Sequence, residues 1–368
     1  MSRAQDLLAR VRLIRTSSIG PVTYRQLLLR FGSAEAALAA LPDLAARGGG
    51  KAPAICPTPV AEREIEQVTK FGARYLAVGE GLYPPALAET DGAPPLLIAK
   101  GNFALFERPL VAIVGARNAS AAASRFARQL AWDLGREDVV VVSGLARGID
   151  AAAHDGAMDS GTIGCAAGEI DIFYPPENEA RQRRMYEVGL VLSETPPGYE
   201  PRARDFPRRN RIIAGLSAGT VVVEAAPRSG SLITARMAAE MGREVMAVPG
   251  SPLDQRAQGC NGLIREGATL VQNAAEVLEA VRPGVAGRVR SGSDRFEYRA
   301  YPSEAPAEEP DTSERARVEE LLGPSPAPVD DLVRLSGLAS GAVQLILLEL
   351  DLAGRLDRHA GGQVSLRA

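Results

Sequence analysis

Cysteine and histidine are scarce in this sequence. Cys56, Cys165 and Cys260 are odd in number and widely spaced, and His154 and His359 lie far apart along the chain. A disulfide framework needs paired cysteines, and a structural zinc site needs closely spaced ligands. The sequence therefore predicts neither kind of site, and we expect no metal or other cofactor.

Long apolar runs and an excess of positive charge are also lacking. Residues 1–15 do not contain the extended apolar core of a signal peptide, and no segment approaches the length of a membrane span. We therefore expect a cytoplasmic protein with no membrane partner.

The 42 basic and 45 acidic residues give a net charge of −3. Because the chain as a whole carries no excess of positive charge, a nucleic acid could bind only where basic residues are clustered.

The two common nucleotide-binding fingerprints are missing as well. No G-x-G-x-x-G follows the first strand of the apolar pattern described below, and no G-x-x-x-x-G-K-[ST] occurs anywhere in the chain. These motifs place glycines and a lysine where a nucleotide's phosphates meet a helix. Their absence disfavours a dinucleotide-binding or Walker-type protein.

The composition divides the 368 residues into four parts. Residues 1–75 have helical spacing of apolar positions, and residues 76–281 alternate short apolar runs with helical segments. Residues 282–312 are rich in Pro, Gly, Ser and charge, which is typical of a flexible linker. Residues 313–368 predict a small domain of three helices and a hairpin that turns at Gly361 and Gly362, as in a winged helix.

The middle part has the pattern of an α/β protein. Six short apolar runs, each a candidate strand, cover residues 111–114, 139–143, 162–166, 190–192, 220–224 and 244–248. Continuous apolar runs of this length suit strands covered on both faces, and helical stretches such as 181–188 lie between them. We therefore predict a Rossmann-like, doubly wound, mostly parallel sheet.

Three strand-to-helix turns in this part contain glycine, with arginine at or near the bend. The start of a helix presents backbone N–H groups and the positive end of its dipole to an anion, and a guanidinium adds charge. Glycine also occurs at such bends simply because the turn requires it. Arginine at all three turns favours a ligand with several phosphates. The candidate residues are Gly115, Arg117, Ser143, Gly144, Arg147, Ser229, Gly230 and Ser231, with Arg228 beside the third turn.

The segment Pro201–Ser217 is the most basic part of the chain. It contains Arg202, Arg204, Arg208, Arg209 and Arg211 against the single acid Asp205. Arginine suits bidentate phosphate contacts, Asn210 adds a polar contact, and Phe206 offers a surface for base stacking. The alternatives are a solvated loop and, for Phe206, burial in the core. We predict that Phe206, Arg208, Arg209, Asn210 and Arg211 bind nucleic acid.

Eight short motifs occur in order along the middle part: GAR (115–117), SGLARGIDAAAH (143–154), YPPEN (174–178), SE (193–194), FPRRNRIIAGLS (206–217), EA (224–225), SGSLITA (229–235) and AVPG (247–250). In this order they resemble DNA-processing protein A, the DprA/Smf family.

That resemblance implies a bacterial protein that is not an enzyme. It implies binding and protection of single-stranded DNA, homodimer formation, and loading of the recombinase RecA during natural transformation. By similarity, Arg117, Arg147 and the FPRRNR segment would line the strand-binding pocket. The stretch 164–171 departs from the family pattern because Glu169 occupies its turn, which weakens the expected anion affinity there.

An enzyme remains the alternative. Rossmann-like phosphoribohydrolases place a glutamate and an arginine around a nucleotide, and Glu224 with Arg117 or Arg147 could do the same. Their P-G-G-x-G-T loop is replaced here by PRSGSLIT. We expect His154 to be an ordinary packed residue and Asp150 to support a helix start. Glu194 and Glu224 are the remaining candidates for catalysis.

The two ends of the chain predict interaction modules. Residues 1–75 resemble a helix-hairpin-helix or sterile-alpha-motif module, although Val22 replaces the second glycine expected in a DNA-binding hairpin. The third helix of the winged helix offers Gln344, Glu349 and Asp351 and no Lys or Arg. Such a face would repel a phosphate backbone. We therefore expect a protein-interaction or autoregulatory role for the winged helix.

Overall fold

In the computed structural model, the described residues are 2–199, 201–203, 205–289, 309–359 and 361–367. They form two compact units: Met1–Ile65 together with Tyr298–Ala368, and Glu66–Glu297. Among these residues, no single helix is long and apolar enough to cross a membrane, whereas one bent pair, Val329–Ser336 with Ser340–Leu352, meets that criterion by length and composition together.

The first unit combines the N-terminal helices with the C-terminal winged helix. The N-terminal helices are α1 (Arg3–Arg15), α2 (Pro21–Phe31), α3 (Ala34–Arg47) and α4 (Thr58–Lys70), which continues into the second unit. Gly20 caps α2 with Pro21 in its first turn, and Ser33 caps α3 through its side chain. Both devices are typical of helix starts, so the helical hairpin follows from the local sequence.

The winged helix is built as predicted from three helices and a small antiparallel sheet of order β10-β12-β11. Gly361 and Gly362 have φ angles of 73° and 68°, which allow the tight turn between its last two strands. The elements are α13 (Thr312–Leu321), β10 (Ala327–Pro328), α14 (Val329–Ser336), α15 (Ser340–Leu352), β11 (Leu356–His359) and β12 (Gln363–Leu366).

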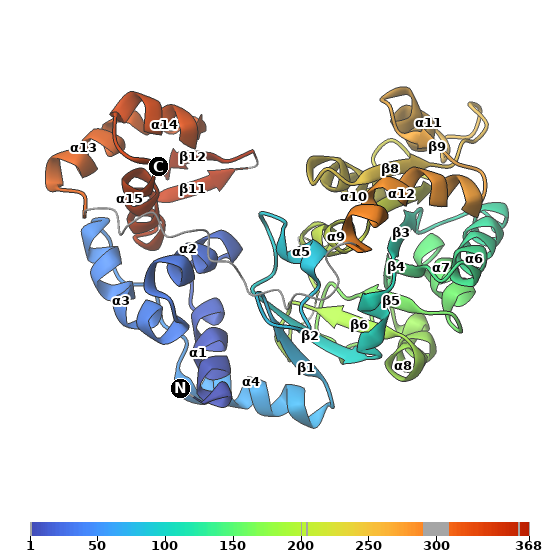
Figure 1. The fold of residues 1–368 in the computed structure, drawn as a ribbon, viewed down its shortest axis with the longest axis horizontal. Helices are drawn as coiled ribbons and strands as arrows, with labels where there is room; N and C mark the ends of the chain where they lie inside the picture. The colour runs from blue at the N-terminus through green and yellow to red at the C-terminus, as the bar shows by residue number, and fades with distance from the viewer. Residues whose placement is uncertain (1, 200, 204, 290–308, 360, 368) are drawn as a thin grey trace. The chain divides into compact units, whose positions relative to one another are not determined.

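The second unit is a nine-stranded sheet of order β1-β2-β6-β5-β4-β3-β7-β8-β9 (Figure 1). Strands β1 and β2 pair antiparallel with their neighbours, and the other strands pair in parallel. The predicted α/β class and mostly parallel Rossmann-like sheet are confirmed. The strands are β1 (Arg74–Ala77), β2 (Leu96–Gly101), β3 (Leu110–Gly115), β4 (Val140–Gly144), β5 (Thr162–Cys165), β6 (Leu190–Ser193), β7 (Gly219–Val223), β8 (Glu244–Ala247) and β9 (Thr269–Leu270).

Helices cover both faces of this sheet. Alternate residues of β3 point to opposite sides: Val111 and Ile113 pack under α6, α7 and α12, and Ala112 and Val114 pack under α5, α9, α10 and α11. Because side chains on both faces of β3 are apolar, helices must pack on both faces of the sheet. The helices are α5 (Pro85–Ala88), α6 (Ala121–Arg136), α7 (Ile149–Ala157), α8 (Glu179–Val188), α9 (Asp205–Leu216), α10 (Gly230–Glu240), α11 (Gln258–Arg265) and α12 (Ala274–Val289).

The segment expected to be a linker, 282–312, is helical at its start. Helix α12 extends to Val289, and α13 begins at Thr312. Residues 290–308 of the expected linker lie outside the described residues. A composition rich in Pro and Gly therefore did not mark the end of α12, since Pro283 and Gly284 lie within the helix.

The chain order places a topological switch point beside β3. The chain runs outward from β3 through β4, β5 and β6, then returns to place β7 on the other side of β3. In doubly wound sheets, ligands bind outside the carboxyl ends of the strands near such a point. The glycine-containing turns after β3 and β4 lie at this edge, as the sequence predicts.

Candidate functional site

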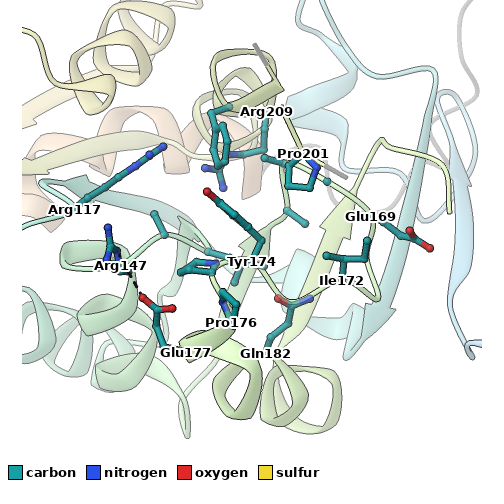
Figure 2. Close-up of a pocket in the computed structure, with 17 residues that line it drawn as sticks. Arg117, Arg147, Glu169, Ile172, Tyr174, Pro176, Glu177, Gln182, Pro201 and Arg209 are labelled. Atoms are coloured by element: carbon teal, nitrogen blue, oxygen red, sulfur yellow. Dashed lines mark ion pairs between the residues drawn. The ribbon is translucent and has the colours of Figure 1, made fainter. Parts of the chain in front are cut away.

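A cavity of about 260 Å³ lies over the carboxyl ends of β3, β4 and β5. Figure 2 shows Arg117, Arg209 and Tyr174 directed into one space from different segments. Four of the predicted residues line it together: Arg117, Arg147, Phe206 and Arg209. The remaining walls include Leu145, residues 166–169, Ile172, residues 174–177, Gln182 and Pro201.

The arginines enter the cavity in different ways. The guanidinium carbon of Arg117 lies 4.8 Å from the centroid of the Phe206 ring, a cation–π contact. Arg147 is more than half exposed, and its Nε lies 3.7 Å from Oε1 of Glu177, so the pair is held weakly. Arg117 and Arg147 can therefore turn toward a phosphate at little cost.

Arg209 is the buried member of the set. Its Nη1 donates to the carbonyl oxygen of Cys165, and its Nε donates to Oδ1 of Asn210 at 3.2 Å. Burial lowers the pKa of Arg209, Asp150 and Cys165 raise it, and the nearby Arg117 guanidinium lowers it further. Two positive charges therefore converge at the cavity, and the single buried carboxylate of Asp150 interacts with both, more strongly with Arg209. A bound anion would relieve that repulsion.

Two aromatic rings form part of the wall. Tyr174 is about half exposed, and its ring centroid lies 5.8 Å from that of Phe206 at an angle of 52°. An exposed aromatic face is a surface on which a nucleobase can stack. Phe206 therefore lies at the cavity instead of in the core, which was the alternative considered from the sequence.

Tyr174 and Glu177 were missed as site residues, although the YPPEN motif that contains them was recognised. Asn178 of the same motif donates from Nδ2 to the carbonyl oxygens of Leu145 and Ala146, at 2.9 and 3.2 Å. These bonds hold the motif against the turn after β4. An aromatic residue followed by two prolines outside any helix was the available signal.

Ser143 and Gly144 lie beneath the cavity and do not line it. Oγ of Ser143 donates to the carbonyl oxygen of Ile113 at 2.6 Å. A Cβ on Gly144 would lie 2.4 Å from Nη1 of Arg209 and 2.5 Å from Oδ2 of Asp150. Glycine is therefore required for Arg209 to lie across the end of β4, and we assign Gly144 a supporting position.

Helix α9 places the arginines of the basic segment on different faces. Arg208 and Arg211, three residues apart on α9, both pair with the nearly buried Glu194, whereas Arg209 faces the cavity. Burial lowers the pKa of Arg211, and Glu194 raises it. Arg211 is thus already paired away from the cavity. Arg202 is exposed and does not line the cavity, and Arg204 lies outside the described residues.

The third predicted turn also does not line the cavity. Ser229 caps α10, and its Oγ lies 2.8 Å from that of Ser231. Nδ2 of Asn210 donates to the carbonyl oxygen of Gly230 at 3.3 Å, which ties α9 to α10. These contacts give Ser229, Ser231 and Asn210 a structural role without a ligand, whereas Gly230 supplies only a backbone carbonyl oxygen.

Several backbone amides at the three turns already have protein partners. Ser120 N donates to Glu224 Oε2 at 2.7 Å, and Ala146 N donates to Asp150 Oδ2 at 3.4 Å. Ser229 Oγ accepts from Ser231 N. The sequence-based expectation that these helix starts present free amides is therefore wrong for these groups, and the positive charge that lines the cavity comes from arginine side chains.

The carboxylates suggested for catalysis are engaged elsewhere. Glu224 holds the start of α6 through Ser120 and does not line the cavity beside Arg117 or Arg147.

His154 is buried, with Nε2 2.7 Å from the carbonyl oxygen of Gly144, and burial lowers its pKa to about 4. His154 is a packed residue, as predicted. Within the described residues, no group of three or more metal-ligating side chains is found.

Glu169 is the one acid that lines the cavity and carries a strongly shifted pKa. Burial and, second to it, the neighbouring Asp171 raise the pKa of Glu169 to about 7, although a hydrogen bond from the Gly198 amide opposes the shift. Near neutral pH this side chain is therefore partly protonated. The reservation about Glu169 drawn from the sequence stands, since its ionised form opposes the arginines.

Three family models match consecutive parts of the chain. Residues 74–282 match the family described as DNA recombination-mediator protein A. The chain belongs to the DprA/Smf family. Residues 4–66 match the DprA-like N-terminal HHH domain, and residues 302–362 match the DprA winged helix domain.

Individual DprA and Smf proteins are similar over much of the chain. DNA processing protein DprA of Streptococcus pneumoniae is 42% identical over 242 residues, covering 65% of this chain and 86% of that protein. Protein Smf of Synechocystis is 30% identical over 379 residues, covering 94% and 95%.

Two solved DprA structures share the fold. That of Streptococcus pneumoniae DprA has a TM-score of 0.60 and 35% identity, and covers 76% of this chain and 98% of that one. A structure of Helicobacter pylori DprA, described for its single-stranded DNA binding mode, has a TM-score of 0.51 and 26% identity, and covers 59% and 96%.

Proposed function

We propose that this protein binds single-stranded DNA in the cavity over β3, β4 and β5. The observation that carries the proposal is the convergence of Arg117, Arg147 and Arg209 with the rings of Phe206 and Tyr174. Arginines supply phosphate contacts, and aromatic faces supply stacking that does not depend on base identity. The Helicobacter pylori relative described as a single-stranded DNA binder supports the same assignment.

The geometry favours an unpaired strand over a duplex. Stacking on Phe206 or Tyr174 requires a base face that is free of its neighbours, which a duplex exposes only if it is opened. The cavity is also small, with room for about one nucleotide at a time. Duplex DNA would therefore contact only the exposed arginines at the rim.

Membership in the family supports the wider role. We infer that this protein acts as a cytoplasmic homodimer without enzymatic activity, which protects incoming strands and loads RecA during natural transformation. Assembly of RecA on oligothymidylate, measured with and without this protein, tests the loading step. No acceleration by the protein would contradict it.

The DNA-binding proposal is tested by fluorescence anisotropy with oligothymidylate and a matching duplex over a range of salt concentrations. We expect preference for the single strand. Arg117→Ala should lower the affinity about tenfold and flatten the salt slope by up to about 0.7, the value for one phosphate contact with a single strand. The reason is the loss of a mobile guanidinium at the cavity.

Arg128→Ala is the matched control. Arg128 is about half exposed on α6, pairs with Asp155 at 3.3 Å and does not line the cavity. Its loss should leave both affinity and salt slope nearly unchanged. Equal effects of the two substitutions would mean that DNA is held by general charge and not by this cavity.

A further inference from the structure

Helix α15 of the winged helix is buried on two opposite faces. One face packs in the winged-helix core through Val343, Ile346, Leu347 and Leu350. A second set of positions is also buried, yet none belongs to that core: Ala342, Leu345, Leu348, Glu349 and Leu352. A helix that is apolar all round must be covered on both sides. The second face therefore has its own partner.

That partner is the N-terminal helical module in the same compact unit. Figure 1 shows α15 beside α3 and α2, and these elements are in contact. Oγ1 of Thr23 donates to Oδ2 of Asp351 at 2.8 Å, and Nε2 of Gln26 donates to Oε1 of Gln344 at 2.8 Å. We call this contact between α2–α3 and α15 the terminal seam.

Arg358 links both sides of the terminal seam. Its Nε donates to Oδ2 of Asp351 at 2.9 Å, and its Nη2 donates to Oε1 of Gln26 at 3.2 Å. The acidic and amide groups that the sequence assigns to an exposed face of α15 are thus in use. Glu349 likewise pairs with Arg315 at 2.8 Å and is almost completely buried.

Two glycines let the backbones meet at the end of the terminal seam. A Cβ on Gly48 would lie 2.1 Å from the carbonyl oxygen of Glu349, and a Cβ on Gly50 would lie 2.4 Å from that of Ala353. Gly48 has a φ of −73°, which any residue adopts. Position 48 therefore requires glycine because the backbone of α15 lies too close for a Cβ atom, and not because of its own φ angle. Nη1 of Arg355 also donates to the Gly48 carbonyl oxygen at 3.2 Å.

We propose that α15 is a protein-docking helix whose occupant is the N-terminal module of the same chain, so that the two terminal modules act as one unit. In helix-turn-helix proteins, the corresponding helix enters the major groove of DNA. Here that use is blocked by the terminal seam, and α15 contains no Lys or Arg. The inference does not depend on what the cavity binds.

Spin-label distance measurements on the full chain test the terminal seam. Ala39→Cys on α3 and Arg334→Cys on α14 place labels at exposed positions, while the three native cysteines are buried. We expect one narrow distance distribution. A broad distribution in this protein would overturn the proposal outright.

Substitutions at the terminal seam provide the comparison. Gly48→Val should broaden the distribution, because its side chain cannot fit against Glu349. Gly323→Ala is the control, since its Cβ would come no closer than 3.9 Å to any atom. The pair Thr23→Val with Gln26→Ala removes polar contacts across the terminal seam without adding bulk, and it should broaden the distribution even if Gly48→Val unfolds the module.

Two further results would overturn the proposal. One is a narrow distribution retained in both Gly48→Val and the Thr23→Val, Gln26→Ala variant. The other is the same narrow distance in a mixture of chains that each carry a single label, together with its loss when doubly labelled chains are diluted with unlabelled ones, because the occupant of α15 would then be a second copy of the chain.

Discussion

At the scale of single residues, the separation between Arg209 and its neighbours on α9 decides which side chains reach the cavity. Arg208 and Arg211 share a helix face with Glu194 as their partner, and Arg209 lies about 100° away around the helix. The sequence shows how many arginines are present, but not the face that each occupies. The structure therefore places Arg209 at the cavity and Arg211 beside Glu194, and DNA binding by either residue stays a prediction.

Arg211→Ala should reduce stability more than DNA affinity. The side chain is largely buried against Glu194, so its loss leaves that carboxylate paired with the more exposed Arg208 and should lower the free energy of unfolding by up to about 3 kcal/mol. Urea denaturation followed through Trp132, the single tryptophan, measures the change. A large fall in affinity for oligothymidylate at unchanged stability would instead place Arg211 in the binding site.

Glu169 gives the cavity a dependence on pH. Because its pKa is raised to about 7 in the folded protein, against about 4.3 in the unfolded chain, the folded state keeps a proton that the unfolded state releases between these values. The free energy of unfolding therefore falls as pH rises from about 4.3 to about 7. Above that range Glu169 adds a negative charge to the cavity.

Glu169→Gln should remove this dependence. Between pH 5 and pH 8 we expect the unsubstituted protein to lose about 1 kcal/mol more stability than the variant, as measured by urea denaturation at both values. The variant should also keep more of its DNA affinity at pH 8. An identical pH response in the two proteins would contradict the assignment.

At the scale of elements, the close packing of two turns positions Arg117. A Cβ on Gly115 would lie 1.9 Å from the carbonyl oxygen of Val223 and 2.6 Å from Cγ1 of Ile149. Gly115→Ala should therefore shift the turn after β3, lower the free energy of unfolding by about 2 kcal/mol and weaken DNA binding, as followed by urea denaturation and anisotropy.

Gly262→Ala on α11 is the matched control for Gly115→Ala. A Cβ there has no atom within 4 Å, and alanine favours helix by about 0.5–1 kcal/mol. This substitution should stabilise the protein or leave it unchanged. Equal destabilisation by both would show that the packing of the turn after β3 is not the cause.

Much of the element structure could be predicted from the sequence, because apolar periodicity and turn residues are local signals. The strands through Val111, Val141 and Val221, the helix starts after Gly148 and Ser229, and the hairpin at Gly361 are all found. The tertiary partners could not be predicted in this way. Asn178 holds the YPPEN segment at the cavity by donating to the carbonyl oxygen of Leu145, and Glu224 accepts a hydrogen bond from the amide of Ser120. Both contacts join parts of the chain that are distant in sequence.

At the scale of the whole molecule, we propose different tasks for the two units. In this proposal the Rossmann-like unit binds the DNA strand at its cavity, and the terminal unit uses α15 for docking within the protein. The absence of basic residues on α15 was visible in the sequence, but its partner was not, since the residues that meet it lie some 300 positions earlier in the chain. Only the folded structure brings them together.

The most direct test of the DNA site is photo-crosslinking of oligothymidylate to the full-length protein, with the crosslinked residues located by mass spectrometry. We expect crosslinks at Phe206 and Tyr174, which Arg117→Ala should reduce and Arg128→Ala should not. Crosslinks found only in residues 2–65 or 309–367, with none at the cavity, would contradict it.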